Sequence, residues 1–490
     1  MELKEKMSKR GKKKRMSKNS FSADSFTGCP APKDRFMLSG IRNIHFVGIG
    51  GTGMSGIAEV LKRYGYTITG SDIVITPVTR RLASMGCKIF TGHRSSNVKN
   101  AHVVVYSSAV NQENIEVVAA AKNNIPVIQR AEMLGELMRI KYGIAIAGSH
   151  GKTSTTSMVS QILSSAGYDP TMVIGGLFKN IGTGGYKGSG DFLVAEADES
   201  DASFLRLSPV LVAVTNIDDD HLNFYGNMDN LKQTFVDFIN SVPFYGMAFL
   251  CIDDVNVAEI LPQLRKKYFT YGFSDKADYV IKILETGFFN TKYEINFRGR
   301  RAGSLTVPLP GLHNVLNSAL AACICLNLGV ALSKIKIALK GYMGVSRRFD
   351  VRGVKNGIIV IDDYAHHPTE VKMTVRTARE TWPDKRIVVL FQPHRYTRTK
   401  EQAWQLGRSF DRADAVCILP IYSAGEEKIP GITSQLIWEN IPRTIRKKMF
   451  SSIDEASEIL AKMLKKNDVF ITVGAGDVYK VGESILKKLK

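Results

Sequence analysis

Short runs of apolar, mainly β-branched residues alternate with stretches of helical periodicity along most of the chain. We predict strands at residues 43–47, 101–106, 143–147, 191–195, 211–215, 358–361, 386–391, 415–419 and 468–473. Because strands that alternate with helices form βαβ units, this pattern favours an α/β fold with parallel sheets. The length of 490 residues corresponds to about three domains of ordinary size.

The overall composition is that of a globular protein. Apolar residues make up 44% of the chain and charged residues 23%, which excludes a wholly disordered chain. No apolar stretch is long enough for a transmembrane helix, so we expect no membrane span. Six cysteines are too few and too scattered for a disulfide scaffold.

The net charge of +20 is unevenly distributed. The first 40 residues hold eleven Lys and Arg against four acids, with no apolar periodicity. We interpret residues 1–38 as a disordered basic extension, without the apolar segment of a secretory signal. We favour a solvated tail. The alternative is an arm that binds nucleic acid or an anionic membrane. The rest of the chain is also basic, which suits acidic, phosphate-bearing ligands.

A glycine turn follows the first predicted strand. Gly48, Gly50 and Gly53 match the pattern G-x-G-x-x-G between the strand and a helix predicted at residues 54–64. Asp72 ends the next strand, 19 residues after Gly53. Glycines let the backbone approach a diphosphate, and the helix N-terminus offers free N–H groups. The pattern fits the pyrophosphate of NAD or of a UDP-sugar equally well.

A second glycine-bearing loop, residues 148–153, carries the sequence Gly-Ser-His-Gly-Lys-Thr between an apolar strand and a helix predicted at residues 154–166. It is a shortened phosphate loop, since Ile146 stands where the usual pattern has its first glycine. The backbone would cradle the phosphates of ATP, Lys152 would offset their charge, and the Thr153 hydroxyl would bind Mg²⁺.

Polar clusters follow four of the other predicted strands. Residues 196–201 and 216–221 are rich in carboxylates, which suit Mg²⁺, and His221 ends the second of these segments. Residues 362–368 and 392–399 bring together Asp, Tyr, His and Arg side chains. Because ligands bind at the carboxyl ends of parallel strands, we expect these segments at the rim of a site. Arg395 and Arg398 could clamp a carboxylate or phosphate, and His366 or His367 could deprotonate an amine.

Together these segments resemble the Mur ligases of peptidoglycan synthesis. The resemblance runs from about residue 41 to the C-terminal end and is carried by residues 47–56, 151–153, 196–201, 347–350, 363–370 and 391–399. It implies a Rossmann-like domain for the UDP-sugar at residues 39–141 and a central ATP-binding, P-loop ATPase-type α/β domain at residues 142–345. It also implies a Rossmann-like domain that receives the amino acid at residues 346–490. Ser149 and Ser154 stand where the family usually has threonine.

The resemblance also implies a role for each candidate residue. UDP-sugar contacts are expected at Gly48, Gly50, Gly51, Gly53, Met54 and Asp72. ATP contacts are expected at Gly148, Ser149, His150, Gly151, Lys152, Thr153, Ser154, His313, Asn314, Asn317 and Arg348. L-Alanine contacts are expected at Tyr364, His366, Arg395 and Arg398, and Mg²⁺ ligands at Thr153, Glu196 and His221. The expected catalytic residues are Lys152, His366, Arg395 and Arg398.

The function implied is an ATP-dependent ligase that joins L-alanine to the lactyl carboxylate of UDP-N-acetylmuramate through an acyl phosphate. We expect a cytoplasmic enzyme, a monomer or homodimer, with no nucleic-acid partner. A related ligase that attaches a ready-made peptide to UDP-N-acetylmuramate is the alternative within the family. Outside it, an NAD-dependent oxidoreductase would use the first glycine turn, and a nucleic-acid-binding protein would use the basic charge alone.

Overall fold

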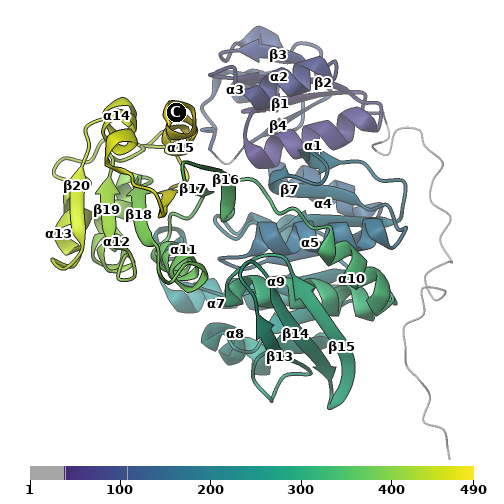
Figure 1. Cartoon of the computed structure of the whole chain (residues 1–490). Helices are drawn as coiled ribbons and strands as arrows, with labels where there is room; N and C mark the ends of the chain where they lie inside the picture. The colour runs from purple at the N-terminus through teal and green to yellow at the C-terminus, as the bar shows by residue number, and fades with distance from the viewer. Residues whose placement is uncertain (1–37, 39, 108, 490) are drawn as a thin grey trace, which may run out of the picture.

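The computed structural model describes residues 38, 40–107 and 109–489, which form three β-sheets in succession along the chain. Each sheet with its helices is called the N-terminal, central or C-terminal domain below. Figure 1 shows the N-terminal domain above the central one, with the C-terminal domain beside them. The basic extension predicted for residues 1–38 lies outside the described residues, apart from Leu38. The described helices include none that is long and apolar enough to cross a membrane.

The N-terminal domain is a five-stranded parallel sheet with the order β3-β2-β1-β4-β5. Its strands are β1 (Asn43–Val47), β2 (Thr67–Asp72), β3 (Lys88–Thr91), β4 (Val103–Tyr106) and β5 (Val127–Gln129). Its helices are α1 (Thr52–Arg63), α2 (Pro77–Ser84), η2 (Ser95–Val98), α3 (Ile115–Lys122) and α4 (Arg130–Arg139). The strand order reverses at β1, so the first glycine turn lies at the switch point where open α/β sheets bind ligands.

The central domain has a ten-stranded sheet with the order β15-β14-β13-β12-β11-β10-β6-β9-β7-β8. Its strands are β6 (Tyr142–Ala147), β7 (Thr171–Phe178), β8 (Thr183–Tyr186), β9 (Phe192–Glu196), β10 (Leu211–Val214), β11 (Met247–Cys251), β12 (Tyr268–Gly272), β13 (Tyr279–Thr286), β14 (Thr291–Phe297) and β15 (Arg300–Val307). Its helices are α5 (Lys152–Ser165), η3 (Ser203–Arg206), α6 (Leu222–Tyr225), α7 (Met228–Asn240), α8 (Val255–Ile260), η4 (Leu261–Gln263), α9 (Leu312–Asn327) and α10 (Leu332–Lys340).

The C-terminal domain has a six-stranded sheet with the order β16-β17-β21-β18-β19-β20. Its strands are β16 (Asp350–Lys355), β17 (Ile358–Asp363), β18 (Arg386–Phe391), β19 (Ala415–Ile418), β20 (Arg446–Met449) and β21 (Asp468–Val473). Its helices are α11 (Pro368–Thr381), α12 (Tyr396–Arg408), α13 (Gln435–Asn440), α14 (Ile453–Met463) and α15 (Tyr479–Lys488). Only β16 runs antiparallel to its neighbour in this sheet.

The strand predictions are confirmed, with shifts of no more than two residues at either end. The expectation of parallel sheets is incomplete, because four pairs of strands are antiparallel: β7 with β8, β13 with β14, β14 with β15, and β16 with β17. Tight turns at residues 287–290 and 298–299 join β13, β14 and β15. The sequence pattern did not predict these three strands. The helices α1 and α5 begin two residues earlier than predicted, because glycine ends each preceding turn.

The N-terminal and central domains share one hydrophobic core. A single cluster of buried side chains runs from Ile44 and Phe46 of β1 to Val212 of β10. Helix α1 packs so closely on β8 that a Cβ atom on Gly56 would lie 3.2 Å from the Gly184 carbonyl oxygen. The relative position of these two domains is therefore set by close apolar packing.

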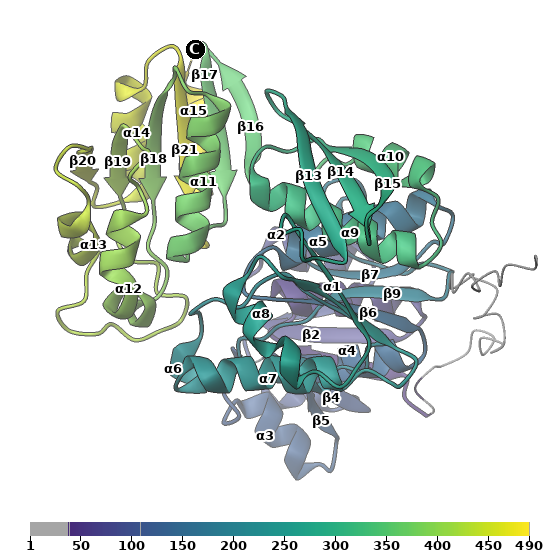
Figure 2. The ribbon, with the colours of Figure 1, turned by 90° about the horizontal axis from the view of Figure 1, so that it is seen from below.

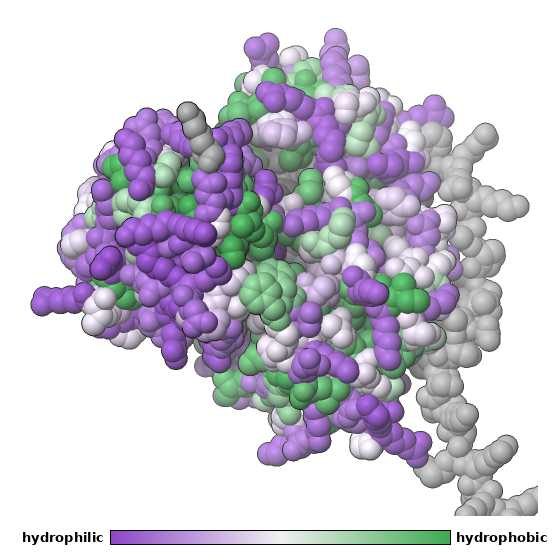
Figure 3. Space-filling view, viewed as in Figure 1, coloured by the Kyte–Doolittle hydropathy of each residue, from purple (hydrophilic) through white to green (hydrophobic). Residues whose placement is uncertain are grey.

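The C-terminal domain has hydrophobic clusters of its own and joins the rest mainly through polar contacts. Lys179 forms an ion pair with Asp350 (2.6 Å), and Arg398 forms one with Asp220 (2.9 Å). One apolar contact lies at the turn after β13, where the ring of Phe289 is 5.9 Å from that of Trp382. Figure 2 shows this domain to one side of the other two, and Figure 3 shows mostly hydrophilic side chains over its visible face.

A buried polar network braces the N-terminal sheet. Glu116 of α3 is fully buried and accepts hydrogen bonds from Ser71 Oγ (2.5 Å), Asn97 Nδ2 (2.5 Å) and the Arg94 N–H (3.2 Å). His93 Nδ1 lies 3.2 Å from the same carboxylate. Burial alone would raise the pKa of Glu116, but hydrogen bonds from His45, Ser71 and Asn97 lower it to about 2.

We predict that Glu116→Gln lowers the free energy of unfolding by about 1–3 kcal/mol at pH 7, because buried donors lose their acceptor. Since the folded-state pKa lies below the usual value, the carboxylate stabilises the fold above about pH 4.5 and loses this effect as the pH falls toward 2. Urea unfolding of both proteins at several pH values measures the difference. A difference that stays constant down to about pH 3 would contradict this role.

Candidate active site

The second glycine loop leaves β6 and enters α5 with two residues in conformations that require glycine. Gly148 has φ +124° and Gly151 has φ +84°. A Cβ atom on Gly148 would overlap Thr215 Oγ1, and one on Gly151 would lie 2.5 Å from Asn317 Oδ1. The N-terminus of α5 therefore carries no side chain between its free N–H groups and the space in front of them, which is a binding site for anions.

Residues after β10 hold this loop from behind. Asn216 Oδ1 accepts a hydrogen bond from the His150 N–H (2.8 Å), and Thr215 Oγ1 donates one to the His150 carbonyl oxygen (2.5 Å). The Ser149 N–H donates to the Asn216 carbonyl oxygen (3.2 Å). Hydrogen bonds with the residues after β10 therefore hold the loop in this shape.

The Lys152 ammonium is hydrogen-bonded to groups of the protein itself. Its Nζ donates to the Gly148 carbonyl oxygen (2.5 Å) and to Glu199 (2.8 Å). Burial would lower the pKa of Lys152, but the Glu199 carboxylate raises it, so the ammonium stays charged. Burial raises the pKa of Glu199 to about 7, against the influence of Lys152. A phosphate in the loop would compete with Glu199 for this ammonium.

One cavity of about 390 Å³ lies where the three domains meet. Gly51, Gly53 and Met54 of the first glycine turn line it, together with Gly151, Lys152 and Thr153 of the second. The C-terminal domain contributes Tyr364, His366, Arg348 and Glu370. Residues predicted from the sequence for three different ligands are therefore brought to a single cavity.

The predicted metal ligands Thr153, Glu196 and His221 also line this cavity. Thr153 Oγ1 donates to Glu196 Oε2 (3.0 Å), and the Gly175 N–H donates to Glu196 Oε1 (2.5 Å). Burial raises the pKa of Glu196, so a cation beside the carboxylate would relieve its desolvation. Hard oxygen donors next to a phosphate loop fit Mg²⁺. His221 has φ +61°, and its ring lies 3.5 Å from Asp220.

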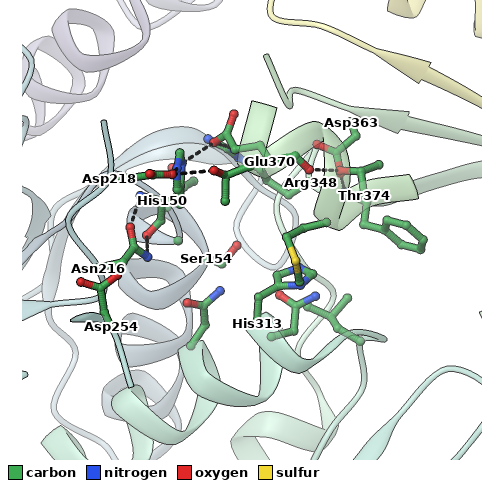
Figure 4. A pocket seen from close by; sticks show the side chains of 18 of the residues that line it. His150, Ser154, Asn216, Asp218, Asp254, His313, Arg348, Asp363, Glu370 and Thr374 are labelled. Atoms are coloured by element: carbon green, nitrogen blue, oxygen red, sulfur yellow. Dashed lines mark hydrogen bonds and ion pairs between the residues drawn. The ribbon is translucent and has the colours of Figure 1, made fainter. Parts of the chain in front are cut away.

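A second cavity, of about 440 Å³, lies between the phosphate loop, α9 and α11 (Figure 4). The residues predicted for ATP that line it are His150, Gly151, Thr153, Ser154, His313, Asn314, Asn317 and Arg348. Ser149 and Lys152 face the first cavity instead, and Gly148 lines neither. Burial lowers the pKa of His313 to about 4, so this imidazole is neutral at pH 7.

Sequence reasoning missed several residues of this second cavity. Asn216, Asp254, Asn256, Glu370 and Thr374 line it as well. Arg348 lies 3.7 Å from Glu370, and its pKa is raised by Glu370 and Asp363 in spite of burial. Glu370 stands in the third position of α11, so the His-Pro-Thr-Glu run itself was a signal that could have identified it.

His150 links the phosphate loop to the C-terminal domain. Its Nε2 lies 2.7 Å from Asp218 Oδ2, and its Nδ1 lies 3.3 Å from Glu370 Oε1. Burial alone would lower the pKa of His150, but these two carboxylates raise it to about 9. In this arrangement the imidazole is positively charged at pH 7.

The four residues predicted for the amino acid divide between two neighbouring cavities. Tyr364 and His366 line the 390 Å³ cavity, whereas Arg395 and Arg398 line one of about 370 Å³. Both cavities include Asp220 and His221, so they adjoin. Burial lowers the pKa of His366 to about 4, and this histidine is neutral at pH 7.

The first glycine turn borders a further cavity, of about 650 Å³, in the N-terminal domain. Gly48, Gly50, Gly51 and Asp72 line it, but Gly53 and Met54 do not. Asp72 Oδ2 accepts a hydrogen bond from the Gly50 N–H (2.8 Å), so this carboxylate also holds the turn. His93, Ser107 and Asn111 line the same cavity and were not predicted.

The chain matches three family models in succession. Residues 43–142 match "Mur ligase family, catalytic domain", residues 146–325 match "Mur ligase middle domain", and residues 347–476 match "Mur ligase, glutamate ligase domain".

Known proteins resemble the chain over nearly its whole length. The UDP-N-acetylmuramate–L-alanine ligase of Geobacter sp. (strain M21) is 49% identical over 456 residues, which cover 93% of this chain and 99% of that protein. The crystal structure of UDP-N-acetylmuramate-alanine ligase MurC from Thermotoga maritima has a TM-score of 0.79 at 29% identity and covers 91% of this chain and 98% of its own. A murein peptide ligase from Psychrobacter arcticus shares the fold, with a TM-score of 0.70 at 23% identity and coverage of 91% and 98%.

We predict that Gly148→Ala weakens ATP binding about tenfold or more. The side chain adds roughly 1–3 kcal/mol of backbone strain and overlaps Thr215, so the loop must move. Gly167→Ala is the matched control, because Gly167 has φ +92° with nothing within 4 Å of its Cβ position. Calorimetric titration with ATP measures both proteins. Equal weakening in the two variants would show that strain anywhere in the domain, rather than the loop geometry, is responsible.

Proposed function

The chain belongs to the Mur ligase family and is an ATP-dependent ligase, and we propose that it joins L-alanine to the lactyl carboxylate of UDP-N-acetylmuramate. The relatives that carry this name are about half identical to the chain over almost its full length, which supports the choice of substrates. The nucleotide-activated substrates imply that the reaction takes place in the cytoplasm and serves peptidoglycan precursor synthesis.

One observation carries the proposal: the 390 Å³ cavity is lined by both glycine turns and by Tyr364 and His366. A sugar nucleotide held at the first turn and ATP held at the second would meet there. The proposed domains therefore bind one substrate each, with the UDP-sugar at residues 39–141, ATP at residues 142–345 and the amino acid at residues 346–490.

A carboxylate does not react with an amine until one of its oxygens becomes part of a leaving group. The γ-phosphoryl group of ATP would pass to the lactyl carboxylate, giving an acyl phosphate and ADP. Lys152 offsets the charge of the transferring group once phosphate displaces Glu199 from its ammonium. The ammonium of L-alanine loses one proton to water, and the neutral amine then attacks the carbonyl carbon. The nitrogen passes a second proton to the departing phosphate, which leaves with one of the original carboxylate oxygens.

We propose that Thr153 and Glu196 hold Mg²⁺, with His221 as a third ligand from the same cavity wall. When bound, the ion offsets the negative charge of the nucleotide phosphates. Thr153 and Glu196 already lie in hydrogen-bond contact, and the Gly175 N–H keeps the carboxylate in place. The chain thus presents the oxygen donors at the N-terminus of α5.

We propose that Arg395 and Arg398 bind the carboxylate of L-alanine, while Tyr364 and His366 border its amine. Arg398 is 11% exposed and is oriented by Asp220 (2.9 Å). Because His366 is neutral at pH 7, its imidazole does not repel the ammonium of the incoming amino acid. The adjoining 370 Å³ cavity then leads the amino acid toward the acyl phosphate.

The first glycine turn lies within the residues that match the first Mur ligase model. The alternative of an NAD-dependent oxidoreductase is therefore not needed to explain this turn. Attachment of a ready-made peptide remains the alternative to L-alanine. The Psychrobacter arcticus murein peptide ligase supports only the shared fold at its 23% identity. The choice between the two acceptors is therefore made by assay.

We expect phosphate release from ATP to require both UDP-N-acetylmuramate and L-alanine, and mass spectrometry to detect the L-alanyl product. Lys152→Met should lower kcat about 10²–10³-fold, because it removes a charge that acts on the transition state. The melting temperature of the variant checks its fold. Turnover with a tripeptide but not with L-alanine would assign the chain to the peptide-attaching branch.

We expect Arg398→Ala to raise KM for L-alanine about 10–100-fold, the equivalent of one charged hydrogen bond, and to leave KM for ATP nearly unchanged. Arg408→Ala is the control, since Arg408 lies on the same helix, α12, outside the cavities described above. Initial rates at varied L-alanine and ATP give both constants. An equal rise in the two KM values would mean that Arg398 acts on the whole site.

A further inference from the structure

A cluster of two histidines and one aspartate lies where the phosphate loop meets the C-terminal domain. It consists of His150 in the loop, Asp218 after β10 and His367 at the start of α11. One ligand atom from each residue lies within 4.8 Å of the others. Of the residues that the structure describes, these are the one group of three His, Cys, Asp or Glu side chains placed so closely.

One possible ligand atom of the cluster has no hydrogen-bond partner. The His367 side chain is 1% exposed, and its Nδ1 has no hydrogen-bond partner. This nitrogen lies 3.6 Å from Asp218 Oδ2, and His150 Nε2 lies 2.7 Å from the same oxygen. A tetrahedral ion with bonds of about 2.0–2.1 Å needs ligand atoms about 3.3 Å apart, so small shifts suffice.

The surrounding groups can orient both imidazoles. Glu370 Oε1 lies 3.3 Å from His150 Nδ1 and would accept a hydrogen bond from it once His150, which is charged at pH 7, gives up its Nε2 proton to bind the ion. The amide of Gln402 lies 3.1 Å from His367 Nε2, and its Oε1 has no partner. With the amide turned by about 180°, Gln402 would give up its hydrogen bond to the Asp219 carbonyl oxygen (3.3 Å), and its Oε1 would accept one from His367 Nε2–H, which leaves the Nδ1 lone pair free. Asp218 itself is held by Thr369 Oγ1 (2.6 Å).

We propose that His150, Asp218 and His367 bind a divalent transition-metal ion such as Zn²⁺, at a site separate from the proposed Mg²⁺ ligands Thr153 and Glu196. Two imidazole nitrogens and one carboxylate are typical of zinc and its neighbours, whereas Mg²⁺ prefers oxygen donors. His150 and Asp218 also line the 440 Å³ cavity, through which an ion could reach them. The fourth ligand of the ion would be water or a phosphate oxygen from that cavity.

The ion would tie the phosphate loop to the C-terminal domain. His150 and Asp218 belong to the central domain, and His367 is the residue before α11. Since the described contacts between these domains are mainly polar, a metal bridge would strengthen a junction that must open to exchange ligands. A bound ion should therefore slow turnover, apart from any effect on ATP itself.

The test is calorimetric titration of the full chain with Zn²⁺ after removal of metals by chelation. We expect one ion per chain, bound at least tenfold more weakly by His367→Ala and by Asp218→Asn. Glu196→Gln is the matched control at the other site and should bind Zn²⁺ as the unchanged protein does. The absence of binding, equal binding by all variants, or a loss confined to Glu196→Gln would overturn the proposal.

Melting temperatures keep this test independent of folding defects. Without metal they show whether each variant is folded, and with Zn²⁺ they should rise for the unchanged protein and for Glu196→Gln only. If His367→Ala does not fold, Asp218→Asn decides the outcome.

Co²⁺ gives an answer on the unchanged protein alone. A tetrahedral spectrum without thiolate absorption is expected, and a thiolate band would place the ion on cysteine instead. Since none of these measurements uses the UDP-sugar or L-alanine, failure here would leave the proposed ligase activity intact.

Discussion

The hydrogen bonds that fix the phosphate loop from behind are the constraint on which the rest of the site depends. A loop that offers its backbone N–H groups to phosphate must keep its front free of side chains, so its support has to come from elsewhere. Thr215 and Asn216, which follow β10, provide it. The same loop also presents Lys152 to one cavity and His150 to the C-terminal domain. Its position therefore sets where three ligands can meet.

The charged groups of the site are paired with one another. Lys152 is paired with Glu199, Arg398 with Asp220, and His150 with Asp218 and Glu370. Buried charges are tolerable only when they are paired, so the carboxylates stand in for the anionic substrates. Binding of ATP or a substrate carboxylate then becomes an exchange of one anion for another. This exchange limits the affinity for the anionic substrates, but the cationic side chains are already oriented toward the cavity.

Much of the fold could be read from the sequence, because alternating strands and helices impose their periods on it. The strands β1, β18 and β21 have the predicted bounds, and both glycine turns lie between a strand and a helix. The antiparallel strands β13 to β15 were not predicted, although β14 alternates buried and more exposed residues, which is typical of an antiparallel strand with one covered face. A residue such as Arg130 could not be assigned in advance, since its role comes from a contact between domains. Arg130 pairs with Asp198 across the junction of the first two domains (2.8 Å). The assignment of Arg395 and Arg398 to a separate, adjoining cavity likewise depends on how α12 packs.

The central claim is that a carboxylate is phosphorylated in the cavity shared by the two glycine turns. The most direct measurement follows oxygen from UDP-N-acetylmuramate labelled with ¹⁸O in its lactyl carboxylate, during ligation with ATP and L-alanine. If an acyl phosphate forms, the phosphate released carries one labelled oxygen, and the amide product keeps the other. Product formation with unlabelled phosphate would contradict the account, because it would mean that the carboxylate is activated without transfer of the γ-phosphoryl group to its oxygen.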